Sequence, residues 1–151
     1  MNDKIPIDAV ITWVDGNDPL HQRKMSLAVS SEKKKKNNLS KYKEAGEIYY
    51  CVQSIIKFAP FIRNIFIVTD NQVPFFIKNK KVHDKRIKVV DHKEIFKGLE
   101  EYMPTFNPRC IDALLHRVPG LSERFIYFND DMFLIKKTQA KDWFTVVGKP
   151  V

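Results

Sequence analysis

Four short runs of β-branched and aromatic residues alternate with helical patterns along this chain, and this alternation constrains the fold more than any other feature. The runs are residues 8–14, 64–69, 87–90 and 125–128. Between the first two, apolar residues recur at helical spacing from Ile48 to Ala59, and Pro60 ends the pattern. Strands that alternate with helices predict a mostly parallel sheet with helices on both faces. We expect residues 1–151 to form a single α/β domain.

Cap signals predict the other helices. An N-cap residue followed by proline predicts helix starts at Asp18-Pro19 and Asn107-Pro108. The capping-box spacing of Asp91 and Glu94 predicts a third. The first helix should run to about residue 29, and the last should end before Pro119. A weaker helix is predicted from Pro74.

The composition limits the class of protein. A chain of 151 residues with 44% hydrophobic and 29% charged residues has enough apolar surface for one core, which excludes disorder. The net charge of +8 favours an anionic partner. The interpretation as a nucleic-acid-binding protein would rest only on this charge and on the run Lys33–Lys36. We therefore expect no nucleic-acid partner. The run itself is typical of a solvated loop, with attraction to a membrane surface or a phosphate as the alternative.

Cys51 and Cys110 each lie in an apolar helical pattern, and both are predicted to be buried core thiols. Two such residues build no disulfide framework. No apolar stretch resembles a signal peptide or approaches the ~20 residues of a membrane span. We therefore expect a cytoplasmic protein.

Acidic residues follow each predicted strand. They are Asp15, Asp70, Asp91 and the pair Asp130-Asp131. In an open α/β sheet the carboxyl ends of the strands form the ligand crevice. The plain alternative is that aspartate is common in turns and caps, and this suffices for Asp91. Adjacent carboxylates repel each other, and a divalent cation such as Mg²⁺ removes that cost, so Asp130 and Asp131 predict binding of a metal and a diphosphate.

One basic residue is a candidate phosphate ligand. Arg117 lies at the end of the helix before Pro119 and is suited to a bidentate phosphate contact, although ordinary placement of a cation in a last helical turn explains it equally well. The chain has no Walker A or GxGxxG sequence and only 5 glycines, so a glycine-rich phosphate loop is not expected. Trp13 and Tyr127 lie in apolar strands and are predicted to be mainly core residues.

Several long blocks resemble a known family. Residues 7–19 read Ile-Asp-Ala-Val-Ile-Thr-Trp-Val-Asp-Gly-Asn-Asp-Pro, and further blocks are residues 57–65, 68–72 and 116–131. They resemble the first and second conserved regions of the Stealth family of sugar-1-phosphate transferases, which act in bacterial capsule synthesis and include the animal N-acetylglucosamine-1-phosphotransferase. The resemblance implies a Rossmann-like or nucleotide-sugar-transferase-like fold, a UDP-sugar donor and a polysaccharide acceptor.

The implied reaction is attack by an acceptor hydroxyl on the β-phosphate of a UDP-linked N-acetylhexosamine or similar sugar, with release of UMP. The resemblance places Asp131 on the family's functional aspartate and Asp112 where the family usually has a catalytic glutamate. Together with the acidic strand ends, this gives the complete prediction for the site. Predicted catalytic residues are Asp112 and Asp131, predicted substrate-binding residues are Asp15, Asp70, Arg117 and Asn129, and the predicted ligands of Mg²⁺ or Mn²⁺ are Asp130 and Asp131.

The chain also departs from the family pattern. Asp112 is one methylene shorter than glutamate, and Tyr49 stands where an arginine is usual. Family members continue into third and fourth conserved regions, whose functional histidine and arginine have no counterpart here. Two alternatives therefore stay open: a catalytically silent, truncated or split remnant or binding subunit, and an ordinary glycosyltransferase that releases UDP. The resemblance also implies association with the capsule machinery or the inner face of the membrane.

Overall fold

The sheet is fully parallel. The computed structural model describes residues 5–28 and 45–151, and its four strands lie in the order β3-β2-β1-β4. The strands are β1 (Ile7–Thr12), β2 (Ile62–Thr69), β3 (Ile87–Asp91) and β4 (Arg124–Asn129). Each predicted strand is present, with its ends shifted by at most two residues, so the predicted α/β class is confirmed.

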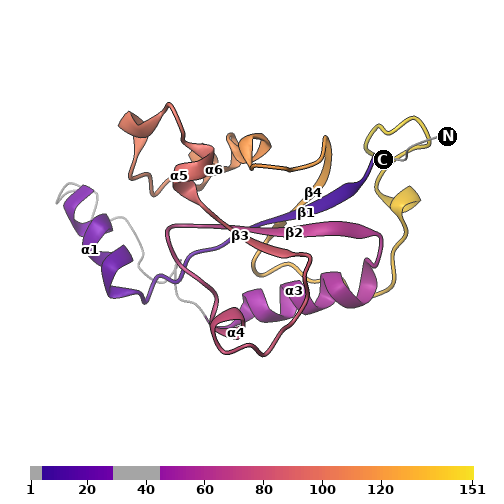
Figure 1. Ribbon diagram of the computed structural model, residues 1–151, viewed down its shortest axis with the longest axis horizontal. Coiled ribbons are helices and arrows are strands. Elements are labelled where there is room, and N and C mark those ends of the chain that lie inside the picture. Colours follow the sequence, from indigo (N-terminus) through magenta and orange to yellow (C-terminus); the bar gives the residue numbers. More distant parts are fainter. Residues whose placement is uncertain (1–4, 29–44) are drawn as a thin grey trace.

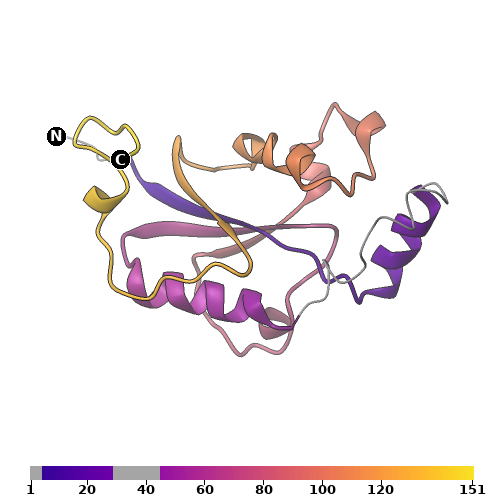
Figure 2. The ribbon, with the colours of Figure 1, turned by 180° about the vertical axis from the view of Figure 1, so that it is seen from behind.

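Helices cover both faces of this sheet. They are α1 (Pro19–Ala28), α3 (Glu47–Phe58), α4 (Phe75–Lys78), α5 (His92–Ile95) and α6 (Pro108–Asp112), with short 3₁₀ turns η2 (Glu100–Tyr102), η3 (Leu115–Arg117) and η4 (Ala140–Asp142). In Figures 1 and 2, α3 and α4 lie on one side of the strands, and α5 and α6 lie on the other. Helix α1 lies beyond the carboxyl end of β1 (Figure 1).

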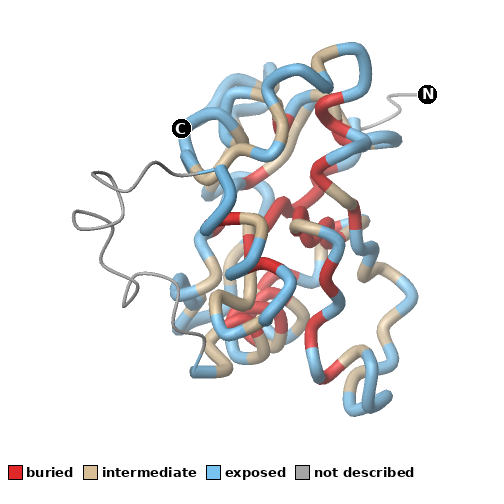
Figure 3. The backbone as a smooth tube through the Cα atoms, turned by 90° about the vertical axis from the view of Figure 1, so that its left-hand side faces the viewer, coloured by how far each residue is buried: buried red, intermediate tan, exposed pale blue. Residues whose placement is uncertain are grey.

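Two buried clusters fill the two faces, because successive side chains of a strand point to opposite sides. On β1, Ile11 packs in the cluster that holds Ile55 of α3, whereas Val10 packs in the cluster that holds Phe96. Figure 3 shows the buried residues concentrated in the middle of the molecule. Burial on both faces explains why the central strands β1 and β2 are largely apolar, whereas the edge strands β3 and β4 are more exposed.

The register brings the carboxyl ends of the strands to one edge. Thr12 of β1 pairs with Val68 of β2 on one side and with Asn129 of β4 on the other. Thr69 pairs with Asp91 of β3. The turns that follow the strands therefore start from a common edge, as expected for a parallel α/β sheet.

The predicted helix caps are present. Asp18 Oδ1 accepts hydrogen bonds from the backbone N–H groups of Leu20 and His21 at 2.7 and 3.0 Å. Asp91 caps α5 by accepting from Lys93 N at 2.8 Å, which confirms its plain structural role. Asn107 caps α6, where Pro108 is the first residue.

Two structural predictions are wrong. The helix expected up to Pro119 is broken into α6 and η3, because the chain tightens into i→i+3 bonds from Leu114 N to Ile111 O and from Arg117 N to Leu114 O. Cys110 is exposed instead of buried, since no residue of the short α6 is buried; Cys51 is buried as predicted.

Two other expectations concern the lysine run and membrane-spanning segments. The lysine run at residues 33–36 lies outside the described residues. Within the described ranges, no helix has both the length and the apolar character needed to cross a bilayer.

Candidate functional site

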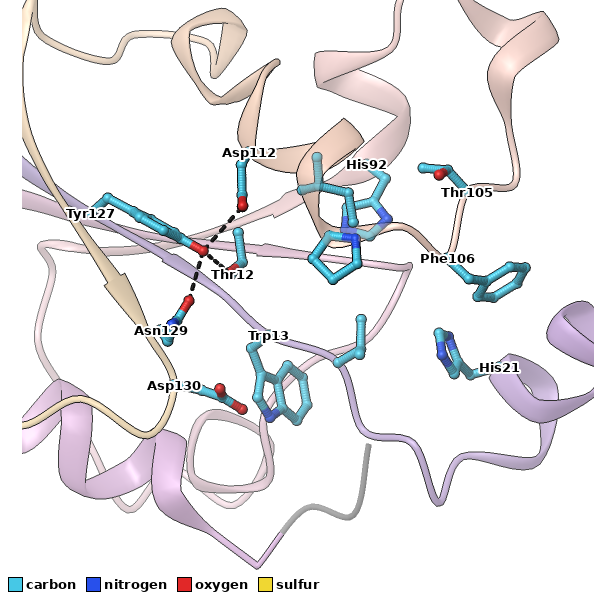
Figure 4. A pocket seen from close by; sticks show the side chains of 13 residues that line it. Thr12, Trp13, His21, His92, Thr105, Phe106, Asp112, Tyr127, Asn129 and Asp130 are labelled. Atoms are coloured by element: carbon cyan, nitrogen blue, oxygen red, sulfur yellow. Dashed lines mark hydrogen bonds between the residues drawn. The ribbon is translucent and has the colours of Figure 1, made fainter. Parts of the chain in front are cut away.

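A cavity of about 410 Å³ opens at the carboxyl edge of the sheet (Figure 4). Its floor is formed by the ends of the neighbouring strands β1 and β4. These ends are Thr12 of β1 with Trp13 and Val14 after it, and Tyr127 and Asn129 of β4 with Asp130 after it. Asp112 of α6 lies above them, and His21, His92 and Phe106 close the far side. This volume is in the range of small-molecule sites, and the position is where open α/β sheets bind ligands.

Strand periodicity explains why these polar residues meet. Tyr127 and Asn129 are two residues apart on β4, so their side chains point to the same face. Thr12 pairs with Asn129 across the β1–β4 ladder, which brings a third polar side chain beside them. Because α6 covers this face, Asp112 reaches the same point from above (Figure 4).

The hydroxyl of Tyr127 connects three of these residues. It lies 2.9 Å from Thr12 Oγ1, 3.0 Å from Asp112 Oδ1 and 2.8 Å from Asn129 Oδ1. Burial raises the pKa of Tyr127, the hydrogen bond from Thr12 opposes this, and the Asp112 carboxylate raises the pKa further. The phenol is therefore protonated at neutral pH and supplies one proton to the network.

A second polar group fixes the far wall of the cavity. Asp70, after β2, accepts from Lys24 Nζ at 2.7 Å and lies 3.0 Å from His21 Nδ1. These contacts join α1 to the end of β2. The hydrogen bond that it accepts from His21, with that from Lys24, holds the pKa of Asp70 far below its usual range although burial opposes it. The His21 ring then packs edge-on against Phe106 at 5.4 Å.

His92 is a buried imidazole at the start of α5 that also lines the cavity. Burial lowers its pKa, although the charges of Asp70 and Asp91 act in the opposite direction. The ring is therefore neutral at pH 7 and offers one donor and one acceptor nitrogen.

The structure places the predicted site residues in two groups. Asp112, Asn129 and Asp130 line the cavity. Those that do not line it are Asp15, Asp70, Arg117 and Asp131.

Local contacts account for three of the four residues outside the cavity lining. Asp15 Oδ1 accepts from Asn17 N in the turn after β1, at 2.8 Å. Asp70 contacts His21 and Lys24 of α1, so it lies behind the His21 ring that lines the cavity. Arg117 donates to the carbonyl of Lys97. Asp131 is exposed in the turn after Asp130.

The donor set at the end of β4 fits a hard cation only in part. Burial is the main reason why the pKa of the Cys51 thiol is raised to about 12, and the nearby charges of Asp130 and Asp131 raise it further. Carboxylate and amide oxygens suit Mg²⁺, which takes one or two protein carboxylates together with phosphate oxygens. Among the residues that the structure describes, no three His, Cys, Asp or Glu side chains are grouped to hold a metal alone. A cation at this position would therefore need further ligands, such as phosphate oxygens, besides these carboxylates.

Comparison with known proteins gives the family. Residues 41–151 match the model for Stealth protein CR2, conserved region 2, and residues 6–31 match Stealth protein CR1, conserved region 1. The chain belongs to the Stealth family. The resemblance noted in the sequence is thereby confirmed.

Curated Stealth relatives are named as polysaccharide phosphotransferases. The chain is 45% identical over 152 residues to "Capsular polysaccharide phosphotransferase fcs1" of Haemophilus influenzae, which covers 98% of this chain and 40% of that protein. It is 38% identical to "Receptor polysaccharide phosphotransferase WefC" of Streptococcus oralis, over 95% of this chain and 43% of the relative. It is 37% identical to "Exopolysaccharide phosphotransferase cps2G" of Lactiplantibacillus plantarum, over 95% of this chain and 41% of the relative. The chain thus spans about two fifths of the length of these relatives.

Sequence reasoning missed several residues of this Stealth cavity. Tyr127 was expected in the core, but it is 38% exposed with its hydroxyl in the cavity. The signal was its position two residues before Asn129, which places both side chains on one face of β4. His21 and His92 had no such signal, because their placement depends on how α1 and α5 pack.

The departure at Tyr49 from the Stealth pattern also has a structural setting. Its ring packs at 6.2 and 5.7 Å from the rings of Phe75 and Phe76. This aromatic cluster lies on the α3 side of the sheet, and Tyr49 does not line the cavity.

Proposed function

We propose that this chain forms the donor-binding part of a sugar-1-phosphate transferase that acts in the synthesis of a capsule or exopolysaccharide. The observation that carries the proposal is the identity of 45% over 98% of the chain with a protein named as a capsular polysaccharide phosphotransferase, coupled with a carboxylate-lined cavity at the ligand edge of the sheet. The donor would be a UDP-linked N-acetylhexosamine or similar sugar, and the acceptor a polysaccharide hydroxyl. We place the reaction in the cytoplasm, at the inner face of the membrane or within the capsule machinery.

The proposed reaction forms one P–O bond and breaks another. The acceptor hydroxyl oxygen bonds to the β-phosphorus of the donor, and the bond from that phosphorus to the oxygen bridging toward the α-phosphate breaks. UMP leaves, and the sugar-1-phosphate becomes part of a phosphodiester. The hydroxyl proton passes to a carboxylate, and Asp112 is our candidate because it lies in the cavity next to the hydrogen-bonding hydroxyl of Tyr127.

Other residues in and around the cavity would bind and orient the donor. Asp130, with Asp131 beside it, would hold Mg²⁺ or Mn²⁺ on the diphosphate, and such an ion supplies neutralisation of the phosphate charge. Asn129 offers an amide to the same region, while Trp13 gives an apolar wall on which a base or sugar ring can pack. Arg117 would contact a phosphate only after leaving the carbonyl of Lys97.

Calorimetric titration tests the donor site directly. UDP-N-acetylglucosamine is titrated into the chain with and without MgCl₂, and we expect binding that depends on the metal. Asp130→Ala and Asp131→Ala should each weaken that binding at least about tenfold, which corresponds to ~1.4 kcal/mol of binding free energy, because each variant lacks one carboxylate ligand of the metal. Glu101→Ala, at an exposed carboxylate that does not line the cavity, is the matched control and should bind as the unaltered chain does. Equal binding in all variants rejects the site.

Product analysis then separates the reaction classes. With a polysaccharide acceptor present, release of UMP supports phosphotransfer, whereas release of UDP identifies an ordinary glycosyltransferase. Donor binding without either product identifies a binding subunit that lacks turnover on its own.

A further inference from the structure

The hydroxyl of Tyr127 has more hydrogen-bond partners than it has protons. A phenol carries one proton and accepts two further hydrogen bonds. Its three partners are oxygens at 2.8 to 3.0 Å, which belong to Thr12, Asp112 and Asn129 (Figure 4). Because the phenol has a single proton, only one partner accepts a hydrogen bond from Tyr127, and the other two must donate to its oxygen.

An ionised carboxylate only accepts, so the proton of Tyr127 goes to Asp112 when Asp112 is charged. Thr12 has a rotating hydroxyl and is free to donate to the phenol oxygen. The Asn129 amide cannot then accept as well. A half-turn of the amide exchanges its oxygen and nitrogen at nearly the same positions, and Nδ2 then donates to the phenol. With one bond donated and two accepted, every contact at the hydroxyl is satisfied.

We propose that Tyr127 is a positioning residue that holds the Asp112 carboxylate in the cavity and turns the amide oxygen of Asn129 toward the bound donor. This proposal rests on the proposed function for its catalytic meaning, but the hydrogen-bond arrangement itself does not. The oxygen of Asn129 adds an acceptor for a sugar hydroxyl or a cation beside Asp130. Asp112 and Asn129 come from α6 and β4, and the hydroxyl of Tyr127 bonds to both.

The direction of each hydrogen bond is measurable without turnover. The ionisation of Tyr127 is followed by the ultraviolet absorbance of tyrosinate, with Tyr127→Phe used to subtract the other tyrosines. Asp112→Asn removes the negative acceptor, so the pKa of Tyr127 should fall. Thr12→Val removes a donor to the phenol oxygen, so the pKa of Tyr127 should rise. A shift in the same direction for both variants, or no shift, overturns the assigned arrangement.

The orientation of Asn129 is read by NMR of its side-chain NH₂ group. In the unaltered chain one amide proton of Asn129 is hydrogen-bonded to the phenol oxygen of Tyr127 and the other is not. The two proton signals should therefore differ in chemical shift and in their rate of exchange with water. Tyr127→Phe should reduce that difference, whereas the matched control Tyr102→Phe, at an exposed tyrosine of η2, should leave it unchanged. Unchanged Asn129 signals in Tyr127→Phe overturn the amide assignment.

Kinetics separate a failure of this proposal from a failure of the proposed function. If the chain has transferase activity, Tyr127→Phe should lower kcat about 10- to 100-fold with little change in KM for the donor, since the misplaced groups act on the chemical step. Spectroscopic changes as expected, with no turnover by the unaltered chain, keep the arrangement and reject the catalytic function. Unchanged kcat in Tyr127→Phe rejects the positioning role.

Discussion

The fully buried carboxylate of Asp8 is paired with the guanidinium of Arg63, whose Nε lies 3.0 Å from Asp8 Oδ1. The same carboxylate accepts from the backbone N–H groups of Asn64 and Ser122 at 3.0 and 2.8 Å. Asp8 is the second residue of β1, so this network joins the start of β1 to β2 and to the turn before β4. Burial opposes ionisation of Asp8, but the hydrogen bond from Arg63 and those from the backbone outweigh it and lower the pKa.

Replacing Arg63 tests how much this network stabilises the sheet. Arg63→Ala leaves a buried carboxylate with two backbone donors and no countercharge, so the free energy of unfolding should fall by about 2 kcal/mol. The loss stays below that of a completely buried pair, because the side chain of Arg63 is 43% exposed. Urea unfolding at pH 7 measures it. Arg23→Ala, at an exposed position of α1, is the control, and an equal loss in both variants contradicts the role of the pair.

Acid should weaken the attachment of α1 through Asp70. Because the pKa of Asp70 is lower in the folded chain than in the unfolded one, its contribution to stability is complete above the unfolded value of ~3.9 and is lost as pH falls below it. Unfolding free energies measured from pH 7 to pH 2 should therefore fall on the acid side. The fall should be smaller by on the order of 1–2 kcal/mol in Asp70→Asn, which has no charge to lose.

A matched carboxylate makes this measurement specific. Glu101→Gln removes an exposed acid, and its pH dependence should match that of the unaltered chain. If Asp70→Asn has the same acid sensitivity as Glu101→Gln, the contacts with His21 and Lys24 do not stabilise the fold.

The sheet was predictable because its signals are local. Each strand is a short apolar run, α3 has a continuous stripe from Ile48 to Ala59, and Asp18, Asp91 and Asn107 cap helices as predicted. The helix expected up to Pro119 failed because propensity does not report where tertiary packing tightens a helix. The error at Cys110 has the same origin, since an unbroken helix would have had a buried face there.

Apart from Asp112, which the resemblance placed in the site, the cavity residues were predictable only where the sheet topology decides their position. That strand ends meet at one edge follows from a parallel sheet, and so Asn129 and Asp130 lie in the cavity. Which aspartate points inward depends on the turn that follows each strand. Asp15 bonds to its own turn and Asp70 is bound by α1, and both contacts involve segments that the strand pattern does not specify.

The two cysteines should differ strongly in reactivity. The thiolate is the nucleophile, and a pKa of about 12 leaves Cys51 roughly one part in 10⁴ ionised at pH 8. Cys110 is exposed, so iodoacetamide in excess should alkylate Cys110 first, as read by mass spectrometry of the digested chain. In urea both should react. Equal labelling of the folded chain contradicts the burial of Cys51 under the end of β4.

Asp112→Glu tests whether the shorter acid limits catalysis. The Stealth resemblance leads us to expect a glutamate here, and one added methylene would carry the carboxylate deeper into the cavity. A displacement of about 1 Å is worth up to ~10²-fold in rate, so Asp112→Glu should raise kcat by about tenfold or more. Asp112→Asn is the matched control and should abolish turnover.

The same change also tests the link to Tyr127, which bonds to Asp112 at 3.0 Å. Glutamate has one more rotatable bond, so it is able to keep that contact while its second oxygen reaches the acceptor. The gain should therefore shrink when Tyr127→Phe is combined with Asp112→Glu, because the longer side chain is then unrestrained. An unchanged rate in Asp112→Glu would mean that proton transfer to this position does not limit the reaction. An equal gain with and without Tyr127 would mean that the phenol does not orient the acid.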